Sequence, residues 1–110
     1  SCCVRSAAVL SALLLGPVLA LAQTAPDASR SRELVRMVRQ DCGSCHGMRL
    51  TGGLGPALTP QALAQHSRDS LIATVTYGRP ARAMPGWAPL LSSSEIAWLV
   101  ERLLQGSPAP

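Results

Sequence analysis

The sequence predicts a small all-α domain. Apolar side chains recur at helical spacing in three stretches, residues 31–41, 67–77 and 92–105, and serines that suit helix N-caps begin the last two. No stretch shows the apolar–polar alternation of a half-buried strand, and no segment repeats. A length of 110 residues allows one small domain.

The first 22 residues predict a cleaved signal peptide. A basic start ends at Arg5, an apolar run covers residues 7–22, and Ala20-Leu21-Ala22 forms a small-residue cleavage site. A transmembrane anchor is the competing interpretation, but the run falls short of the roughly 20 apolar residues of a span, and Gly16-Pro17 interrupts it. The expected organisation is a signal peptide at 1–22, a flexible lead at 23–30, a folded domain at 31–106 and a tail at 107–110.

The first helix is expected at residues 31–41. Leu34, Val35 and Val38 form its apolar stripe and lead to Cys42, while arginines at positions 32, 36 and 39 lie on the other face. We interpret Met37 as a core residue of this helix.

Two shorter helices are expected in the middle of the chain. Thr59-Pro60 combines an N-cap with a proline at the first helical position, which predicts a short helix to about Gln65. Ser67 caps the next helix and Gly78 ends it. Its apolar stripe consists of Leu71, Ile72 and Val75.

The last helix has the strongest local signals. Ser92 and Glu95 form a capping box, and Gly106 ends the helix. Its apolar stripe consists of Ile96, Leu99, Val100, Leu103 and Leu104. Trp98 lies off this stripe, so we expect it at the edge of a crossing between two helices.

The sequence Cys42-Gly43-Ser44-Cys45-His46 predicts a covalent attachment site for a c-type haem, with two thioether bonds and His46 as an iron ligand. A thioredoxin-like pair would need a strand–helix context, and half a zinc site would need two more ligands at similar spacing. A disulfide across a two-residue gap would constrain the unfolded chain very little. With no Phe, two Trp and one Tyr, the chain has few large aromatic side chains for a core. A covalently held haem would supply the missing apolar surface.

A glycine-rich loop at residues 47–56 follows the motif. A ligating imidazole needs an acceptor for its second nitrogen, and we expect the carbonyl of Pro56 to hold His46 in this way. Leu54 and Leu58 are expected to pack on the haem. A second loop, residues 79–91, contains Met84 followed by a proline that stiffens its backbone.

The charge of the chain argues against a nucleic-acid partner. All ten basic residues are arginines, against six acidic residues, and the formal charge is +4. The arginines are scattered and few aromatic side chains could stack on bases. Arg49, Arg79 and Arg82 either rim the haem edge or are ordinary solvated side chains.

With these elements in order, the chain resembles class I cytochrome c. Cys42 and Cys45 match the thioether cysteines of that family, and His46 matches its proximal ligand. Gly55-Pro56 matches the loop whose carbonyl holds the proximal imidazole, and Met84 matches the distal ligand in a Met-Pro pair. The resemblance implies two axial side chains and no open iron position.

The resemblance covers residues 33–105. Ile96-Ala97-Trp98-Leu99 matches the C-terminal helix, where an aromatic side chain packs at the crossing with the first helix. The first helix departs from the family because it lacks the usual glycine and aromatic pair. The implied structure is a small class I cytochrome c fold around one covalent haem c, with Trp87 packing on the haem.

Two segments, residues 42–60 and 78–87, also resemble the short c-55X cytochromes of denitrification gene clusters. That resemblance implies a monomeric periplasmic electron carrier, with an upstream donor and the dissimilatory nitrite reductase as partners. One rival is a factor that assists maturation of the d-type haem of that reductase. Another is a haem sensor or enzyme in which Met84 dissociates from the iron and leaves a position open. His66 is a rival to Met84 as the distal ligand.

Overall fold

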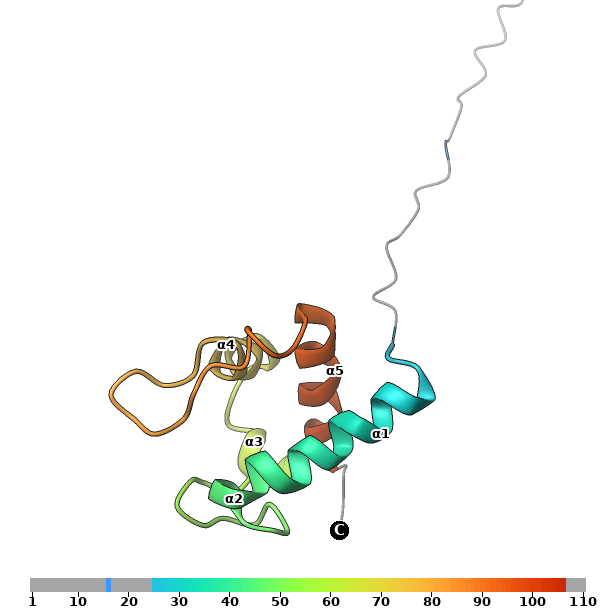
Figure 1. The fold of residues 1–110 in the computed structure, drawn as a ribbon. Helices are drawn as coiled ribbons and strands as arrows, with labels where there is room; N and C mark the ends of the chain where they lie inside the picture. The colour runs from blue at the N-terminus through green and yellow to red at the C-terminus, as the bar shows by residue number, and fades with distance from the viewer. Residues whose placement is uncertain (1–15, 17–24, 107–110) are drawn as a thin grey trace, which may run out of the picture.

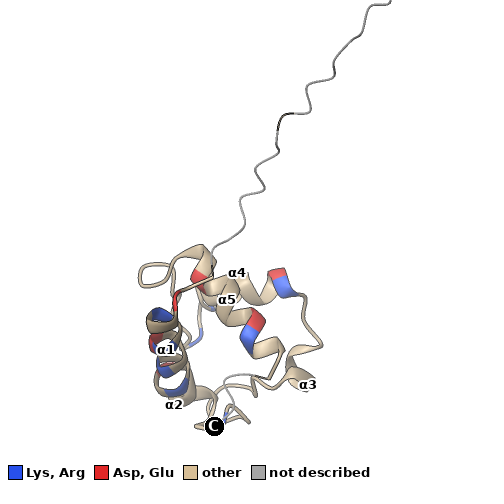
Figure 2. Cartoon of the chain, turned by 90° about the vertical axis from the view of Figure 1, so that its right-hand side faces the viewer, with Lys and Arg blue, Asp and Glu red and all other residues tan. Residues whose placement is uncertain are grey.

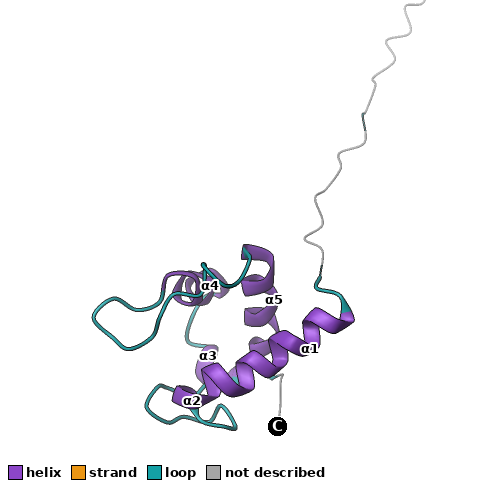
Figure 3. Cartoon of the chain, in the orientation of Figure 1, coloured by secondary structure: helices purple, strands orange, loops and turns teal. Residues whose placement is uncertain are grey.

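A computed structural model describes Gly16 and residues 25–106 of the chain. Helices and loops make up the described residues, which contain no strand (Figure 3). The elements are α1 (Ala28–Met37), η1 (Val38–Cys42), α2 (Gly43–His46), α3 (Pro60–Leu63), α4 (Arg68–Tyr77) and α5 (Ser93–Leu104) (Figure 1). The prediction of a small all-α fold is therefore confirmed.

Two of the expected segments lie outside the described residues. These are the signal peptide at 1–22, of which the structure describes Gly16 alone, and the tail at 107–110. Within the described part of the chain, no helix has the length and apolar character needed to cross a membrane.

Helix α1 begins three residues before the predicted start. The carboxylate of Asp27 accepts a hydrogen bond from the backbone N–H of Arg30 at 2.8 Å, so Asp27 is the N-cap. Residues 28–30, expected to belong to the flexible lead, therefore form the first turn of the helix.

The first helix also continues further than predicted. The π-helical turn η1 joins α1 to α2, so a continuous helical segment extends from Ala28 to His46. Gly47 ends the segment with a φ of +94°. The cysteine motif, to which the predicted helix led, therefore lies on the last helical turns of this segment.

The three later helices begin at their predicted caps. Thr59 Oγ1 accepts from the N–H of Ala62 at 3.3 Å, and Ser67 Oγ accepts from that of Ser70 at 3.1 Å. At α5, Ser92 Oγ accepts from Glu95 N–H, and a Glu95 carboxylate oxygen accepts from Ser92 N–H at 3.0 Å. The predicted capping box is present.

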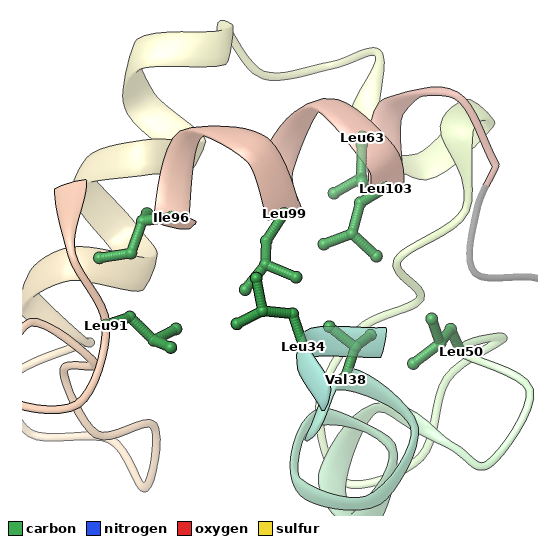
Figure 4. Close-up of a cluster of buried hydrophobic side chains, with 8 residues drawn as sticks. All are labelled: Leu34, Val38, Leu50, Leu63, Leu91, Ile96, Leu99 and Leu103. Atoms are coloured by element: carbon green, nitrogen blue, oxygen red, sulfur yellow. The ribbon is translucent and has the colours of Figure 1, made fainter. Parts of the chain in front are cut away.

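The core lies between the first helical segment and α5. Leu34 and Val38 face Leu99 of α5 in Figure 4 and are almost fully buried. The other members of the buried cluster are Leu50, Leu63, Leu91, Ile96 and Leu103. The Arg30 guanidinium donates to Glu95 and adds a polar contact between α1 and α5. The helices at the two ends of the described domain are thus held together, as the family resemblance implies.

Helix α4 differs from α5 because none of its residues is fully buried. Leu71, Ile72 and Val75, its predicted apolar stripe, are only partly covered by the core. This stripe contributes to the wall of the cavity described next.

Candidate haem site

An apolar cavity lies between the helices and the two long loops. Side chains from each of the helical elements and from both loops reach it. Its lining residues include Met37, Val38, Cys42, His46, Pro56, Leu58, Leu63, His66, Leu71, Val75, Arg79, Met84, Trp87, Leu91, Leu99 and Leu103. The predicted site residues Cys42, His46, Pro56, Leu58, Met84 and Trp87 are among them, although their positions span 46 residues of sequence.

The two cysteines occupy different environments. Cys42 is half-buried on the cavity wall, whereas Cys45 is exposed. The two thiols form no disulfide with each other. Burial raises the pKa of the Cys42 thiol to about 11, and Asp41 adds to this rise. Among the described residues, no group of three or more His, Cys, Asp or Glu could hold a metal ion, so the zinc interpretation has no support here.

His46 has a fixed orientation. Its Nδ1 lies 2.6 Å from the carbonyl oxygen of Pro56, the acceptor expected from the sequence. A carbonyl cannot donate, so Nδ1 carries the hydrogen and Nε2 keeps its lone pair. An imidazole held in this tautomer is suited to bind a metal through Nε2.

The loop after the motif packs tightly on the His46 ring. Gly55 N–H donates to the Cys45 carbonyl and Gly52 N–H to that of His46, each at 2.8 Å. A Cβ at Gly55 would lie 2.8 Å from both Cε1 and Nδ1 of His46. Only glycine lets this backbone approach the ring so closely and place the Pro56 carbonyl beside Nδ1.

The second loop brings Met84 to the same cavity. Two hydrogen bonds fix this loop. Arg79 N–H donates to the Met84 carbonyl at 3.1 Å, and Trp87 N–H donates to the Val75 carbonyl of α4 at 2.9 Å. Gly78 has a φ of +72°, and a Cβ there would lie 2.6 Å from the Met84 carbonyl oxygen. The end of α4 is thereby joined to the loop that presents Met84 and Trp87.

Leu54 does not fit the expectation from sequence. Its side chain is 94% exposed and is not part of the cavity wall, whereas Leu58 lies on that wall. The hydrogen bonds of the tight loop turn Leu54 outward while they place Pro56 inward. His66, considered as a rival ligand, also reaches the cavity but is largely exposed.

The sequence interpretation missed several contributors to the wall. Met37, assigned to the helix core, lines the cavity, and so do Ala62 and Thr74. The helical periodicity of α1 and α4 signals an inward face but does not distinguish a side chain that meets another helix from one that meets a cavity. No local signal separates these two cases.

These residues fit a covalently attached haem. The cavity wall is mostly apolar, the imidazole tautomer of His46 is fixed, and a thioether sulfur is present at Met84. Gly55 lets the loop pack directly on the His46 ring, and His46 and Pro56 both lie on the cavity wall. Cys42 on the wall and Cys45 at the surface would then bind one edge of the haem.

Comparison with known proteins shows the family to which this chain belongs. Residues 29–101 match the family described as "Cytochrome C oxidase, cbb3-type, subunit III". A cytochrome c55X from Stutzerimonas stutzeri is 60% identical over 106 residues, covering 96% of this chain and 92% of that protein. A solved "c-type cytochrome NirC" is 60% identical with a TM-score of 0.75, and the match covers 77% of this chain and all of that one. The chain belongs to the class I c-type cytochromes of the NirC (cytochrome c55X) type.

A larger protein contains a domain similar to this NirC-type cytochrome. The "Dihydro-heme d1 dehydrogenase" of Pseudomonas aeruginosa strain PAO1 is 36% identical over 96 residues, which cover 87% of this chain but 18% of that protein. The solved structure "Dihydro-heme d1 dehydrogenase NirN in complex with DHE" has a TM-score of 0.61. Membership of a cytochrome c family implies that the NirC-type chain binds haem.

Proposed function

We propose that the chain is a monomeric, periplasmic monohaem cytochrome that carries single electrons from an upstream donor to the dissimilatory nitrite reductase of denitrification. The presence of Met84 on the same cavity wall as His46 is the observation that carries this proposal. The 60% identity to cytochrome c55X supports the assignment to denitrification.

Each residue of the site has a role in this proposal. Cys42 and Cys45 would hold the haem through thioether bonds, and His46 and Met84 would bind its iron. The Pro56 carbonyl keeps the His46 ring oriented. The haem-packing side chains are Leu58 and Trp87, both on the cavity wall, whereas the exposed Leu54 has no such role.

The haem, when bound, supplies a one-electron iron couple whose potential a methionine ligand raises. The ligands His46 and Met84 suit that couple to electron transfer rather than to the making or breaking of bonds in a substrate. With His46 and Met84 both bound to the iron, the chain would leave no ligand position for a substrate. The apolar wall disfavours added charge and favours the reduced state further.

Substitution of Met84 tests the ligand assignment. We expect Met84→Ala to abolish the far-red absorption feature of methionine-ligated ferric haem, while covalent haem is retained. Met48→Ala is the matched control, because the Met48 side chain is 70% exposed and lies outside the cavity. Persistence of the feature in Met84→Ala would show that another methionine binds the iron, and Met37, which also lines the cavity, would be the next to substitute. Absence of the feature from the native protein would instead point to His66 as the ligand.

The open-site alternative has its own test. If Met84 dissociates and the protein is a sensor or enzyme, carbon monoxide binds to the reduced protein at neutral pH. We expect no binding in the native chain and rapid binding in Met84→Ala. Binding of equal extent in both proteins would contradict the electron-carrier proposal.

The similarity to dihydro-haem d1 dehydrogenase favours a second candidate, a role in maturation of the d-type haem. Deletion of the gene separates the two functions. An electron donor leaves the d-type haem content of the nitrite reductase normal and slows its reduction. A maturation factor leaves a reductase with less d-type haem.

A further inference from the structure

A second hollow on the molecule has no part in the haem site. It is a groove between α1 and α5, and the described residues that line it include none of those that line the haem cavity. Its lining residues are Ser31, Arg32, Val35, Arg36, Arg39, Gln40, Trp98 and Arg102. Four of these eight are arginines and none is acidic, so the groove is positively charged.

The arginines are arranged along one side of a helix. Arg32 and Arg36 are four residues apart, so they project from the same face of α1, and Arg39 follows on η1. Figure 2 shows blue Lys and Arg positions along α1. All three side chains are exposed. Repulsion among like charges at this spacing destabilises an isolated helix. An anionic partner would relieve it.

Each acidic side chain of α1 and α5 binds an arginine. Glu33 of α1 binds Arg30 at 2.7 Å, and Glu95 of α5 binds the same guanidinium. Glu101 binds Arg68 of α4 at 3.1 Å. These three carboxylates therefore bind Arg30 and Arg68, neither of which lines the groove.

The far wall of the groove offers an aromatic surface. Trp98 is half-buried, and the guanidinium of Arg102 lies 5.5 Å from its ring centroid, within the range of a cation–π contact. Stacking of this kind orients the planar fork of an arginine, which binds carboxylates in a bidentate manner. Val35 and Trp98 add apolar contact beside the charges.

We propose that this α1–α5 groove docks an acidic polypeptide segment of a partner protein. A concave groove with a partly apolar wall fits an extended chain bearing Asp and Glu side chains better than the flat surface of a lipid bilayer. The groove and the haem cavity share no described lining residue, so a segment that binds in the groove need not contact the cavity wall or Met84. The partner would hold the cytochrome through the groove while electrons pass at the haem edge.

The test uses the haem-loaded protein and a hexaglutamate peptide as the probe. We expect the peptide to shift the Trp98 indole NMR signal, and raised salt to weaken binding. Arg32→Gln with Arg36→Gln should raise the dissociation constant about fivefold, the effect of two exposed ion pairs. Arg49→Gln with Arg82→Gln removes the same charge from exposed sites outside the groove and should change binding less than twofold.

Three outcomes would overturn the proposal. One is an equal loss of affinity in both double variants, which would show that net charge alone attracts the peptide. Another is peptide-induced shifts confined to residues around Arg49 and Arg82. The third is binding to phosphatidylglycerol vesicles that depends on Arg32 and Arg36 while the peptide does not bind. A melting temperature unchanged from that of the native protein confirms that each variant is folded.

Discussion

Gly55 illustrates how one residue controls the orientation of a ligand. A methyl group at this position would lie 2.8 Å from two atoms of the His46 ring, and the loop is held to α2 by its own hydrogen bonds. The ring or the Pro56 carbonyl must therefore move if the methyl group is added. The expected cost of such overpacking is about 1–3 kcal/mol.

We therefore predict that Gly55→Ala lowers the melting temperature of the haem-loaded protein by on the order of 5–15 °C. It should also alter the ferric haem spectrum, because His46 loses its fixed acceptor. Gly43→Ala is the matched control, since its Cβ would meet no heavy atom closer than 3.7 Å and its φ of −61° is helical. Similar effects of both substitutions would contradict a specific contact with His46.

Glu95 has two roles at the start of α5. It completes the capping box with Ser92 and pairs with Arg30 of α1, so it acts on one helix and on the contact between two. The Arg30 guanidinium, followed by the Ser92 N–H, lowers the pKa of Glu95 from about 4.5 to about 2. A carboxyl with a lowered pKa in the folded state stabilises that state above the unfolded pKa.

The stability that Glu95 provides should therefore be complete above about pH 4.5 and should disappear as the pH falls to about 2. We predict that Glu95→Gln lowers the melting temperature by on the order of 2–4 °C at pH 7. The difference from the native protein should vanish near pH 2. Glu33→Gln, which also removes a partner of Arg30 but leaves the cap intact, should have a smaller effect. A constant difference at all pH values would contradict the ion-pair explanation.

The elements that were predicted correctly are those with local signals. Thr59, Ser67 and Ser92 each cap a helix by accepting from the backbone N–H three residues ahead, so the sequence alone reveals them. Asp27 caps α1 in the same way. It was not predicted as a cap because the polar, proline-containing segment around it favoured a flexible lead. The π turn η1 was missed because apolar periodicity does not encode one extra residue in a turn.

At the scale of the whole molecule, the site was predictable only in part. His46 and Pro56 lie ten residues apart, so the motif and its loop indicated their hydrogen bond. The assignment of Met84 needed the family resemblance, since nothing local indicates that residues 46 and 84 line the same cavity. The outward turn of Leu54 depends on the three-dimensional path of its loop and was not predictable.

The distribution of buried residues suggests that the haem is part of the core. Helix α5 has five buried residues, whereas α4 has none, and the partly covered Leu71 and Val75 of α4 line the cavity. A domain of this size buries a limited apolar surface of its own and is marginally stable. The haem would supply the surface against which α4 packs.

We accordingly predict that α4 loses its structure first when the haem is absent. In the chain produced without haem, backbone amides of Arg68–Tyr77 should exchange with solvent at least tenfold faster than in the haem-loaded protein. Those of α5 should keep part of their protection, because Ile96, Leu99 and Val100 still pack in the Leu34–Val38 cluster or beside it. Hydrogen exchange read by NMR or mass spectrometry compares the two helices in one sample. Equal protection of α4 and α5 without haem would show that the polypeptide alone completes the core.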